Sequence, residues 1–400
     1  MKSPARCILT INGGSSSIRF AVYDVMAPLR LRLAGKIDRV GLKGTRLRVE
    51  RSTGKNGRTV RIPSSDHGGT IRFLYDWLEA QPFFADVHAV GHRVVHGLKH
   101  SAPERITSGL MAELRRITPY DPEHLPHELA LIDEFRRRHP RLPQVACFDT
   151  AFHRTMPKVA RLLPIPRRYA AEGVERYGFH GLSYGYLLEE LRRIDPAAAR
   201  GRVILAHLGN GASLAAVRAG RSIDTSMGFT PAAGLVMSTR SGDLDPGLVF
   251  YLARTEKMTP AGFQRMVNHE SGLLGISGTS PDIRDLLARK DRDPRAAEAI
   301  ALFCYQAKKW IGSFAAALGG LDTLVFAGGI GENAPVIRRQ ICEGLEFLGL
   351  TVDSKRNARN APLISTASGR VRVRVIPTNE ELMIARSVIR LLRLTGKPNS

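Results

Sequence analysis

An arginine lies among small residues, turn formers and carboxylates between residues 224 and 246. The segment begins Asp-Thr-Ser-Met-Gly-Phe-Thr-Pro at Asp224 and continues through Arg240 to Asp243 and Asp245. Its apolar residues lack the periodicity of a packed helix or strand. An arginine there can bind planar carboxylate or phosphate oxygens with both prongs of its guanidinium group and stays charged at any working pH. The segment predicts a site for an anionic reactant, with a loop-stabilising salt bridge as the alternative.

Three other polar residues occupy positions suited to chemistry. Arg93 follows a strand-like run at 87–90, Asp149 ends an apolar strand, and His180 lies between Phe179 and Gly181. In open α/β sheets, ligands bind outside the carboxyl ends of the strands, so Asp149 is a candidate for contact with metal or substrate. A solvated arginine and a core histidine are the plain alternatives, and none of the three residues is decisive alone.

Two Gly-rich turns join pairs of predicted strands. Strands at 8–12 and 18–23 flank the turn at 13–17, and strands at 202–208 and 212–217 flank the Gly-Asn-Gly turn that starts at Gly209. Such turns expose successive backbone N–H groups, which form a concave nest for phosphate oxygens. Their recurrence predicts a duplicated αβ domain that holds a nucleotide in the cleft between the two copies.

A third Gly-rich segment, 328–333, follows the apolar strand at 323–327 and leads into a helix starting near Pro335. Its spacing matches neither a P-loop nor a Rossmann fingerprint, so close approach of the backbone to a nucleotide is the preferred interpretation. A strand at 371–376 then precedes Asn379, a good helix N-cap, and Glu380. For Glu380, a favourable place in a first helical turn and a metal-binding role both remain open.

Length and composition describe a soluble globular protein. The 400 residues, 43% hydrophobic and 24% charged, are enough for two domains with separate cores. The first residues lack an apolar signal region and no apolar run approaches bilayer length, so we expect a cytoplasmic protein. The four cysteines are far apart and form no CxxC pair, which favours buried core positions over a zinc site or disulfides.

The formal charge of +22 and pI near 10.5 are typical of nucleic-acid-binding proteins. The basic residues are nevertheless spread along the whole chain, without a recognisable nucleic-acid-binding motif. The longest cluster, 136–138, ends a predicted amphipathic helix, where cations favour the helix dipole. We therefore disfavour a nucleic-acid role. The positive field would instead steer small anionic substrates.

The order of these segments resembles that of the acetate kinases. The matching segments extend from near residue 8 to near residue 386 and lie at 12–17, 91–97, 148–157, 176–181, 207–211, 224–246, 328–333 and 377–381. The resemblance implies the actin-like (ribonuclease H-like) α/β fold of sugar kinases and Hsp70 ATPase domains, duplicated, with two domains hinged over a central nucleotide cleft. It also implies a homodimer and the reversible, magnesium-dependent reaction of ATP with acetate to give ADP and acetyl phosphate.

The resemblance also assigns domains. Residues 1–149, completed by a C-terminal helix at 386–400, are expected to form an acyl- and phosphate-binding domain. Residues 150–385 are expected to form a nucleotide-binding and dimerisation domain. The ligands it implies are ATP or ADP, acetate or propionate, and Mg²⁺, which Mn²⁺ can replace.

Position by position, the resemblance implies four catalytic residues. Arg93 resembles the arginine that orients the carboxylate, and Arg240 its partner on the transferring phosphoryl group. His180 is implied to donate a hydrogen bond to the same oxygens, and Asp149 resembles the family's catalytic carboxylate. In-line transfer between two anions depends on positioning and charge neutralisation, which agrees with cations beside the moving group.

The same resemblance implies the binding residues. Asn12 and Glu380 match the residues that hold Mg²⁺, a hard cation that prefers oxygen ligands. The walls of the acyl pocket match Val95, Tyr120, Phe179 and Pro231. The nucleotide contacts match Ser15, Ser17, Arg19, His207, Leu208, Gly209, Asn210, Gly211, Asp282, Ile283, Arg284, Gly329, Ile330, Gly331, Glu332 and Asn333.

The sequence departs from the family pattern in a few places. Arg19 stands where lysine is common, and Ser238 replaces a usual glycine. The stretch Pro119-Tyr120-Asp121-Pro122 stands where the family commonly has Pro-Leu-His-Asn-Pro, so it is interpreted as one residue shorter, with Tyr120 in place of a pocket leucine. One methylene is worth only about 1 to 3 kcal/mol in such a pocket, so acetate and propionate remain open as substrates.

Other classes of function make different predictions. A propionate kinase would share every catalytic residue. A non-catalytic ATP-binding module would not need both Arg93 and Arg240, and a nucleic-acid-binding protein would be retained on DNA in a salt-sensitive way. Gly329 and Ile330 are small enough to admit adenosine, which disfavours a kinase that uses pyrophosphate.

Overall fold

Two antiparallel β-hairpins begin the two sheets of the computed structural model, which describes residues 6–14, 17–41, 44–51, 57–64 and 66–394. The first pairs β1 (Cys7–Gly13) with β2 (Ser17–Asp24), and the second pairs β9 (Arg202–Leu208) with β10 (Ala212–Arg218). In each sheet the first hairpin strand also pairs in parallel with a later strand, β6 or β12. This shared arrangement confirms the predicted duplicated α/β fold.

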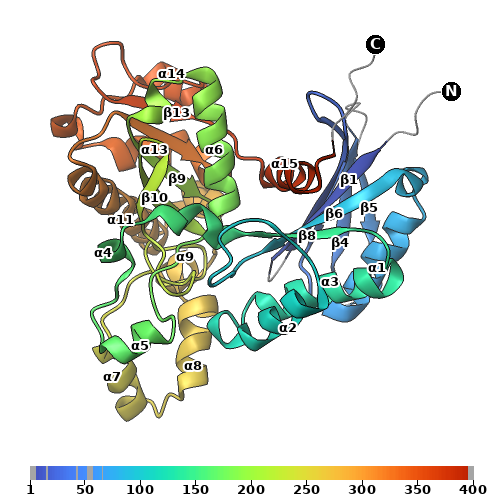
Figure 1. Cartoon of the computed structure of the whole chain (residues 1–400). Coiled ribbons are helices and arrows are strands. Elements are labelled where there is room, and N and C mark those ends of the chain that lie inside the picture. The colour runs from blue at the N-terminus through green and yellow to red at the C-terminus, as the bar shows by residue number, and fades with distance from the viewer. Residues whose placement is uncertain (1–5, 15–16, 42–43, 52–56, 65, 395–400) are drawn as a thin grey trace. The chain divides into compact units, whose positions relative to one another are not determined.

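The chain divides into two units (Figure 1). One comprises Met1–Ala151 with Asn379–Ser400, and the other comprises Phe152–Thr378. The segment that returns to the first unit thus begins at Asn379, earlier than the residue 386 expected from the sequence. Asn379 caps helix α15 (Glu380–Leu392) by accepting a hydrogen bond from Leu382 N, and the helix packs on β1, β6 and β2.

The first sheet has the strand order β5-β4-β3-β2-β1-β6-β8-β7. Its parallel centre, β1-β6-β8, carries the residues expected to do chemistry at its carboxyl edge. Its remaining strands are β3 (Arg30–Asp38), β4 (Arg46–Arg51), β5 (Arg58–Arg61), β6 (Val87–Val94), β7 (Glu104–Arg105) and β8 (Gln144–Phe148).

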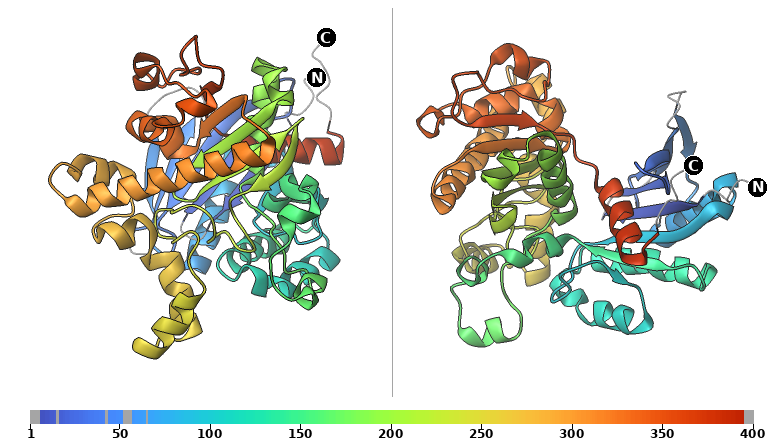
Figure 2. Two further views of the ribbon diagram at one scale, coloured as in Figure 1. Left: turned by 90° about the vertical axis from the view of Figure 1, so that its left-hand side faces the viewer. Right: turned by 45° about the horizontal axis from the view of Figure 1, so that its top comes forward.

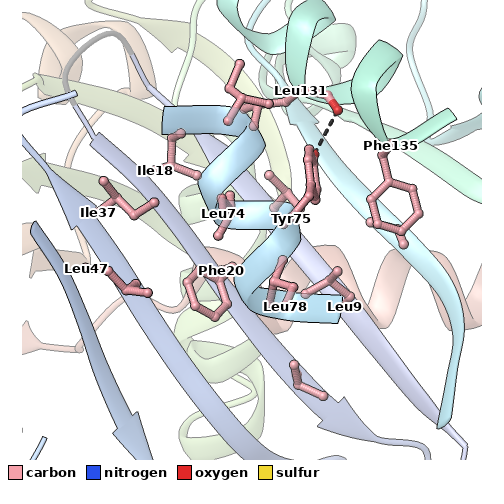
Figure 3. Close-up of a cluster of buried hydrophobic side chains, with 14 of the residues drawn as sticks. Leu9, Ile18, Phe20, Ile37, Leu47, Leu74, Tyr75, Leu78, Leu131 and Phe135 are labelled. Atoms are coloured by element: carbon pink, nitrogen blue, oxygen red, sulfur yellow. Dashed lines mark hydrogen bonds between the residues drawn. The ribbon is translucent and has the colours of Figure 1, made fainter. Parts of the chain in front are cut away.

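Helices cover both faces of this sheet. α1 (His67–Glu79) and α3 (Leu125–Arg138) bury alternate residues of β1 and β2 in a core that includes Leu9, Phe20 and Leu74. Within that core, shown in Figure 3, the hydroxyl of Tyr75 donates to the carbonyl of Leu131 at 2.8 Å, so the buried polar atom is satisfied. Helix α15 lies on the opposite face, where a Cβ at Gly91 would be 2.4 Å from Ile384 Cγ2. Only glycine allows this close approach.

The second sheet has the order β11-β10-β9-β12-β13. Helix α6 (Gly181–Ile194) packs on one face through Leu187 and Leu191. The 25-residue helix α11 (Pro294–Leu318) crosses this sheet and contacts β9, β10 and β11, as Figure 2 shows. The remaining strands are β11 (Arg221–Thr225), β12 (Thr323–Ala327) and β13 (Arg372–Val375).

Shorter helices connect these elements. They are α2 (Ser108–Arg116), α4 (Lys158–Arg161), α5 (Arg167–Ala171), α7 (Gly247–Thr255), α8 (Pro260–Arg265), α9 (Gly272–Ser277), α10 (Ile283–Arg289), α12 (Gly328–Asn333), α13 (Pro335–Cys342) and α14 (Ser354–Ala358), with 3₁₀ turns η1 (Pro82–Asp86), η2 (Thr118–Tyr120), η3 (Asp149–Thr155), η4 (Ala198–Arg200) and η6 (Glu346–Leu348), and the π-helical turn η5 (Met266–Glu270).

Two local predictions were wrong. The Gly-rich segment expected as a loop forms helix α12, because Gly328 adopts a φ of 76° that turns the chain directly from β12 into a helix. Arg93 lies inside β6 rather than after the strand, since pairing with β8 continues to Val94. The four cysteines are buried and free, as predicted. Among the helices of the described residues, none is long and apolar enough to cross a membrane.

Candidate active site

Arg93 and Asp149 meet at the carboxyl edge of the first sheet. Nε and Nη2 of Arg93 donate to the same oxygen, Asp149 Oδ2, at 3.0 and 2.6 Å, and Nη1 donates to the carbonyl of Gly13 at 3.2 Å. Burial is the largest single effect and lowers the pKa of the Arg93 guanidinium group, but the charges of Asp149, Glu380 and Glu128 together outweigh it and raise this pKa. The structure thus fixes a charged arginine against the carboxylate that the sequence singled out.

Asn12 faces two acidic side chains at the start of α15. Its Nδ2 donates to Glu380 Oε2 at 2.8 Å and to Glu381 Oε1 at 3.2 Å. Burial, followed by the nearby charge of Glu380, raises the pKa of Glu381, while Arg19 lowers it. Arg19 lies directly opposite Asn12 in the β1–β2 hairpin. The sequence interpretation named Asn12 and Glu380 and missed Glu381, although its place next to Glu380 was a signal.

Asn12, Glu380 and Glu381 are residue types that can ligate a divalent metal. Among the described residues, no three or more histidine, cysteine, aspartate or glutamate side chains form a group that could hold a metal. Asn12, Glu380 and Glu381 nevertheless offer an amide oxygen and two carboxylates, and Mg²⁺ commonly binds through one or two carboxylates together with substrate phosphates. A cation there would also offset the repulsion between the two glutamates.

The turn between β1 and β2 is described in part. Ser15 lies outside the described residues. The carbonyl of Ser17 accepts a hydrogen bond from Gly14 N at 2.8 Å, which closes the turn. This bond joins the two described ends of the turn.

Two of the predicted acyl-pocket residues belong to the first unit. Val95, 1% exposed, directly follows β6, and its N–H donates to Glu128 Oε2 at 2.9 Å. Tyr120, in η2, packs against the apolar cluster formed by α2, α3 and Phe148, with its ring 5.9 Å from that of His96. Tyr120 therefore contributes to the core of its own unit.

His124 is a residue that the sequence interpretation missed. The proline, histidine, proline spacing of the family pattern also occurs at Pro122, His124 and Pro126, three residues beyond the stretch that begins at Pro119. His124 is 7% exposed, and its Nδ1 shares a hydrogen bond with Asp121 Oδ1 at 2.9 Å. The signal was present in the sequence, three residues beyond the position considered.

In the second unit, His180, Gly211 and Arg240 converge. His180 adopts a left-handed φ of 59° ahead of α6, and its Nδ1 shares a hydrogen bond with Ser213 Oγ at 2.8 Å. A Cβ at Gly211 would lie 3.0 Å from His180 Nε2 and 3.7 Å from Arg240 Nη1. Arg240 Nη1 also donates to the carbonyl of Pro231 at 3.3 Å. The absence of a side chain at Gly211 therefore leaves space between two polar groups suited to an anion.

His207 joins this cluster through its ring. The His180 and His207 rings stack with centroids 4.3 Å apart, and Ser183 Oγ holds His207 Nδ1 at 2.8 Å. Beside it, the turn from Gly209 is held by Asn210, whose carbonyl accepts from Ser238 N at 3.1 Å. Leu208 and Phe179, which directly precede Gly209 and His180 in the chain, are buried.

The Gly-rich helix α12 presents its backbone beside the same turn. A Cβ at Gly329 would meet nothing within 4 Å, and Gly329 N lies 3.8 Å from a Cβ placed on Gly209. Glu332 Oε1 accepts from Gly328 N and Thr378 N at 2.8 and 3.0 Å, which ties the helix to the segment after β13. Asn333 donates to the carbonyl of Gly329 at 3.1 Å. Ile330 and Gly331 are buried within α12.

Asp282 to Arg284 form the start of α10. Asp282 caps this helix by accepting from Arg284 N at 2.9 Å, and its carboxylate also pairs with the exposed guanidinium group of Arg284. Ile283 is buried and 4% exposed. The capping interaction orients an exposed arginine in the second unit.

The comparisons with known proteins agree with this geometry. The model of the acetokinase family matches residues 7–386. An acetate kinase of Methylocella silvestris is 43% identical over 97% of this chain and 98% of its own, and a propionate kinase of Citrobacter rodentium is 44% identical over 96% of each. The crystal structure of Porphyromonas gingivalis acetate kinase superposes with a TM-score of 0.86 at 36% identity, over 97% of this chain and 100% of the other.

The fold and the site residues define an actin-like α/β phosphotransferase with a carboxyl group as acceptor. ATP as a substrate and a divalent metal are properties of this class. The chain belongs to the acetokinase family.

Proposed function

We propose that the protein is an acetate kinase that transfers the γ-phosphoryl group of ATP reversibly to acetate, giving acetyl phosphate and ADP. The observation that carries this proposal is the Arg93–Asp149 pair at the carboxyl edge of the first sheet, in a chain that belongs to the acetokinase family. The fixed charge of Arg93 suits an acceptor carboxylate. Mg²⁺, for which Mn²⁺ can substitute, would neutralise the phosphates when held by Asn12 and Glu380.

In the proposed reaction, an acetate oxygen attacks the γ-phosphorus and the bond from that phosphorus to the β–γ bridging oxygen breaks, so that ADP leaves. Arg93 orients the acetate, and Asp149 orients Arg93 through its two hydrogen bonds. Arg240 and His180 stabilise the charge on the equatorial oxygens of the moving group. The backbone of the Gly209 turn binds the remaining phosphates.

The nucleotide is proposed to contact α12 and the start of α10. Gly329 faces open space, so the backbone of α12 is accessible to adenosine. The proposed contacts extend through Asn333 and from Asp282 to Arg284, and Ser15, Ser17 and Arg19 would contact phosphate. We propose a cytoplasmic location because the enzyme uses ATP. In the first unit these assignments make residues 1–149 the acyl- and phosphate-binding domain.

We further propose a homodimer formed through the second unit. Helix α7 contains no buried residue, although Leu248, Val249, Phe250 and Tyr251 are apolar and 36 to 66% exposed. Four consecutive apolar residues exposed on one helix are typical of an interface. We propose that a second copy of the chain covers this apolar face of α7.

The test of the proposed activity is the rate of acyl phosphate formation with Mg-ATP, trapped as the hydroxamate. We expect turnover with acetate and a higher kcat/KM for acetate than for propionate. A higher kcat/KM for propionate would retain the mechanism and change the substrate, as the propionate kinase relatives allow. Absence of turnover with either acid would refute the proposed function.

A further inference from the structure

Glu128 is a buried acid beside the proposed acetate site. It lies in the first turn of α3 and is 2% exposed. Its Oε2 accepts from Val95 N at 2.9 Å, at the end of the strand that carries Arg93. Its Oε1 is buried and has no hydrogen-bond partner among the described residues. The side chain therefore anchors the backbone next to Arg93 while one of its oxygens remains unsatisfied.

The surroundings of Glu128 contain more negative than positive charge. The charged groups that act on it are Arg93 from β6, Asp121 ahead of α3 and Asp149 after β8. The other helices packed on α3 pair with different residues of it: the His67 ring of α1 stacks on that of His127, Asp76 and Glu79 of α1 pair with Arg138, and Arg115 of α2 pairs with Asp133. Arg93, the only cation among the groups acting on Glu128, already gives two hydrogen bonds to Asp149.

Ionisation of Glu128 would place another negative charge where two anions must react. A buried carboxylate without a counter-ion is costly, and a neutral carboxylic acid in an apolar site can still act in hydrogen bonding. Burial raises the pKa of Glu128 to about 8, against the lowering effects of Arg93 and of the Val95 N–H bond. The favourable helix dipole at the first turn of α3 does not outweigh this burial.

We propose that Glu128 is a positioning residue for the phosphoryl-transfer reaction, acting as a neutral acid that fixes Val95 and leaves Arg93 to Asp149 and the acceptor carboxylate. This inference rests on the proposed function for its catalytic part. The state of the side chain itself can be tested without activity. In the ionised form, Glu128 competes with Asp149 for Arg93 and repels the anionic substrates. The KM for acetate therefore rises and the rate falls.

The kinetic test compares pH profiles of kcat/KM for acetate in the wild type, Glu128→Gln and Glu128→Ala, with Asp133→Asn as the control for removal of an exposed acid from the same helix. Glutamine keeps the acceptor for Val95 N and cannot ionise. We expect the wild type and the control to lose activity as the pH rises through about 8. Glu128→Gln is expected to retain activity at pH 7 to within about threefold and to lose this alkaline decline.

Glu128→Ala leaves the buried Val95 N–H unpaired and is expected to raise KM for acetate by about tenfold or more, with a smaller effect on kcat. An alkaline decline at the same pH in Glu128→Gln would overturn the inference, because another group would then be responsible. Equal losses in Glu128→Gln and Glu128→Ala at pH 7 would also overturn it, since they would show that the negative charge is required.

Denaturant unfolding supplies a measurement independent of turnover. The pKa of Glu128 is raised in the folded state, so the wild type is expected to lose stability relative to Glu128→Gln as the pH rises from about 4.5 to about 8. If the difference in unfolding free energy between the wild type and Glu128→Gln stayed constant across this pH range, Glu128 would not be neutral in the folded protein. If the wild type turned over neither acid, the proposed function would fail, while this measurement would still decide the state of the side chain.

Discussion

Arg93 donates two hydrogen bonds to a single oxygen of Asp149 across the parallel strands β6 and β8. The contact orients the guanidinium plane through Nε and Nη2, while Nη1 reaches the carbonyl of Gly13. Asp149 is 1% exposed, so the pair is held in a site that excludes water on one side. In the proposed reaction, the carboxylate acts by fixing the arginine.

The first prediction follows from that pair. Asp149→Asn keeps the shape but removes the charge that holds Arg93, and Arg93→Lys keeps the charge but loses the fork. We expect each variant to lose kcat/KM by a factor on the order of 10² or more. Steady-state kinetics of the two variants and their double variant provide the measurement. If the loss of transition-state free energy in the double variant equalled the sum of the two single losses, the coupling would be contradicted, because the effects of residues in contact are not additive.

Arg240 gives a second prediction in the other unit. Arg240→Lys retains a cation near His180 and Gly211 but loses the planar fork, whereas Arg240→Ala loses both. We expect a loss in kcat on the order of 10² for alanine and a smaller loss for lysine, with little change in KM for acetate. If both variants retained wild-type kcat, Arg240 would have no role in transition-state stabilisation.

The sequence predicted the fold well where the pattern is local. Both hairpins, the strand at β12, the N-cap Asn379 and the cationic end of α3 follow from turn chemistry and periodicity, which depend on adjacent residues. The extension of β6 through Arg93 could not be predicted in this way. It depends on pairing with β8, a strand more than fifty residues later, whose register is fixed by burial of both faces.

The candidate site was less completely predicted. Arg93 and Asp149 were named separately, and their contact needs the parallel pairing of β6 with β8. Glu128 was not singled out, because a glutamate in a first helical turn reads as an ordinary favourable charge. Its importance is visible only from its burial and from the bond to Val95 N.

Buried histidines predict loss of stability in acid. Burial lowers the pKa of His92, His96 and His153 to about 4, from an ordinary value of 6.5. The unfolded chain therefore binds more protons than the folded protein between these values, so stability present above about pH 6.5 is lost as the pH falls towards 4. Each histidine contributes up to about 1.4 kcal/mol per pH unit in that interval.

Urea unfolding at pH 7, 6 and 5 measures this slope. His92 shares a hydrogen bond with Gln144 Oε1 at 2.8 Å. His92→Gln removes one titrating group and keeps a side chain that can donate a hydrogen bond. We expect a shallower decline for His92→Gln than for the wild type. His88→Gln, at a half-buried position on the same strand, is the control. If stability fell with equal slope in the wild type and in His92→Gln, the pKa of His92 would not be lowered in the folded protein.

Arg338 predicts a link between stability and the nucleotide site. The guanidinium group is fully buried, and burial lowers its pKa to about 10. It donates to the carbonyls of Gly331 and Glu332 at 2.8 and 3.0 Å and to Asn357 Oδ1 at 2.8 Å, so neutral acceptors in α12 and α14 hold it.

Arg338→Met would leave these carbonyls unpaired. We expect a fall in unfolding free energy of about 3 to 5 kcal/mol and a larger rise in KM for ATP than in KM for acetate. Arg339→Met, which changes the exposed neighbouring arginine, is the control. Thermal unfolding together with both KM values measures the effect, and equal changes in the two KM values would show that Arg338 does not act through α12.

The exposed face of α7 predicts how the protein assembles. Phe250 is 66% exposed in a helix with no buried residue, so a charge at this position would have little effect on folding of the monomer. We expect Phe250→Asp to convert a dimer into a monomer in light scattering coupled to size exclusion. Phe347→Asp, at a site 73% exposed in η6, should leave the dimer intact. A wild-type monomer at micromolar concentration would remove the case for a dimer, and a dimer retained in Phe250→Asp would place its interface away from this residue.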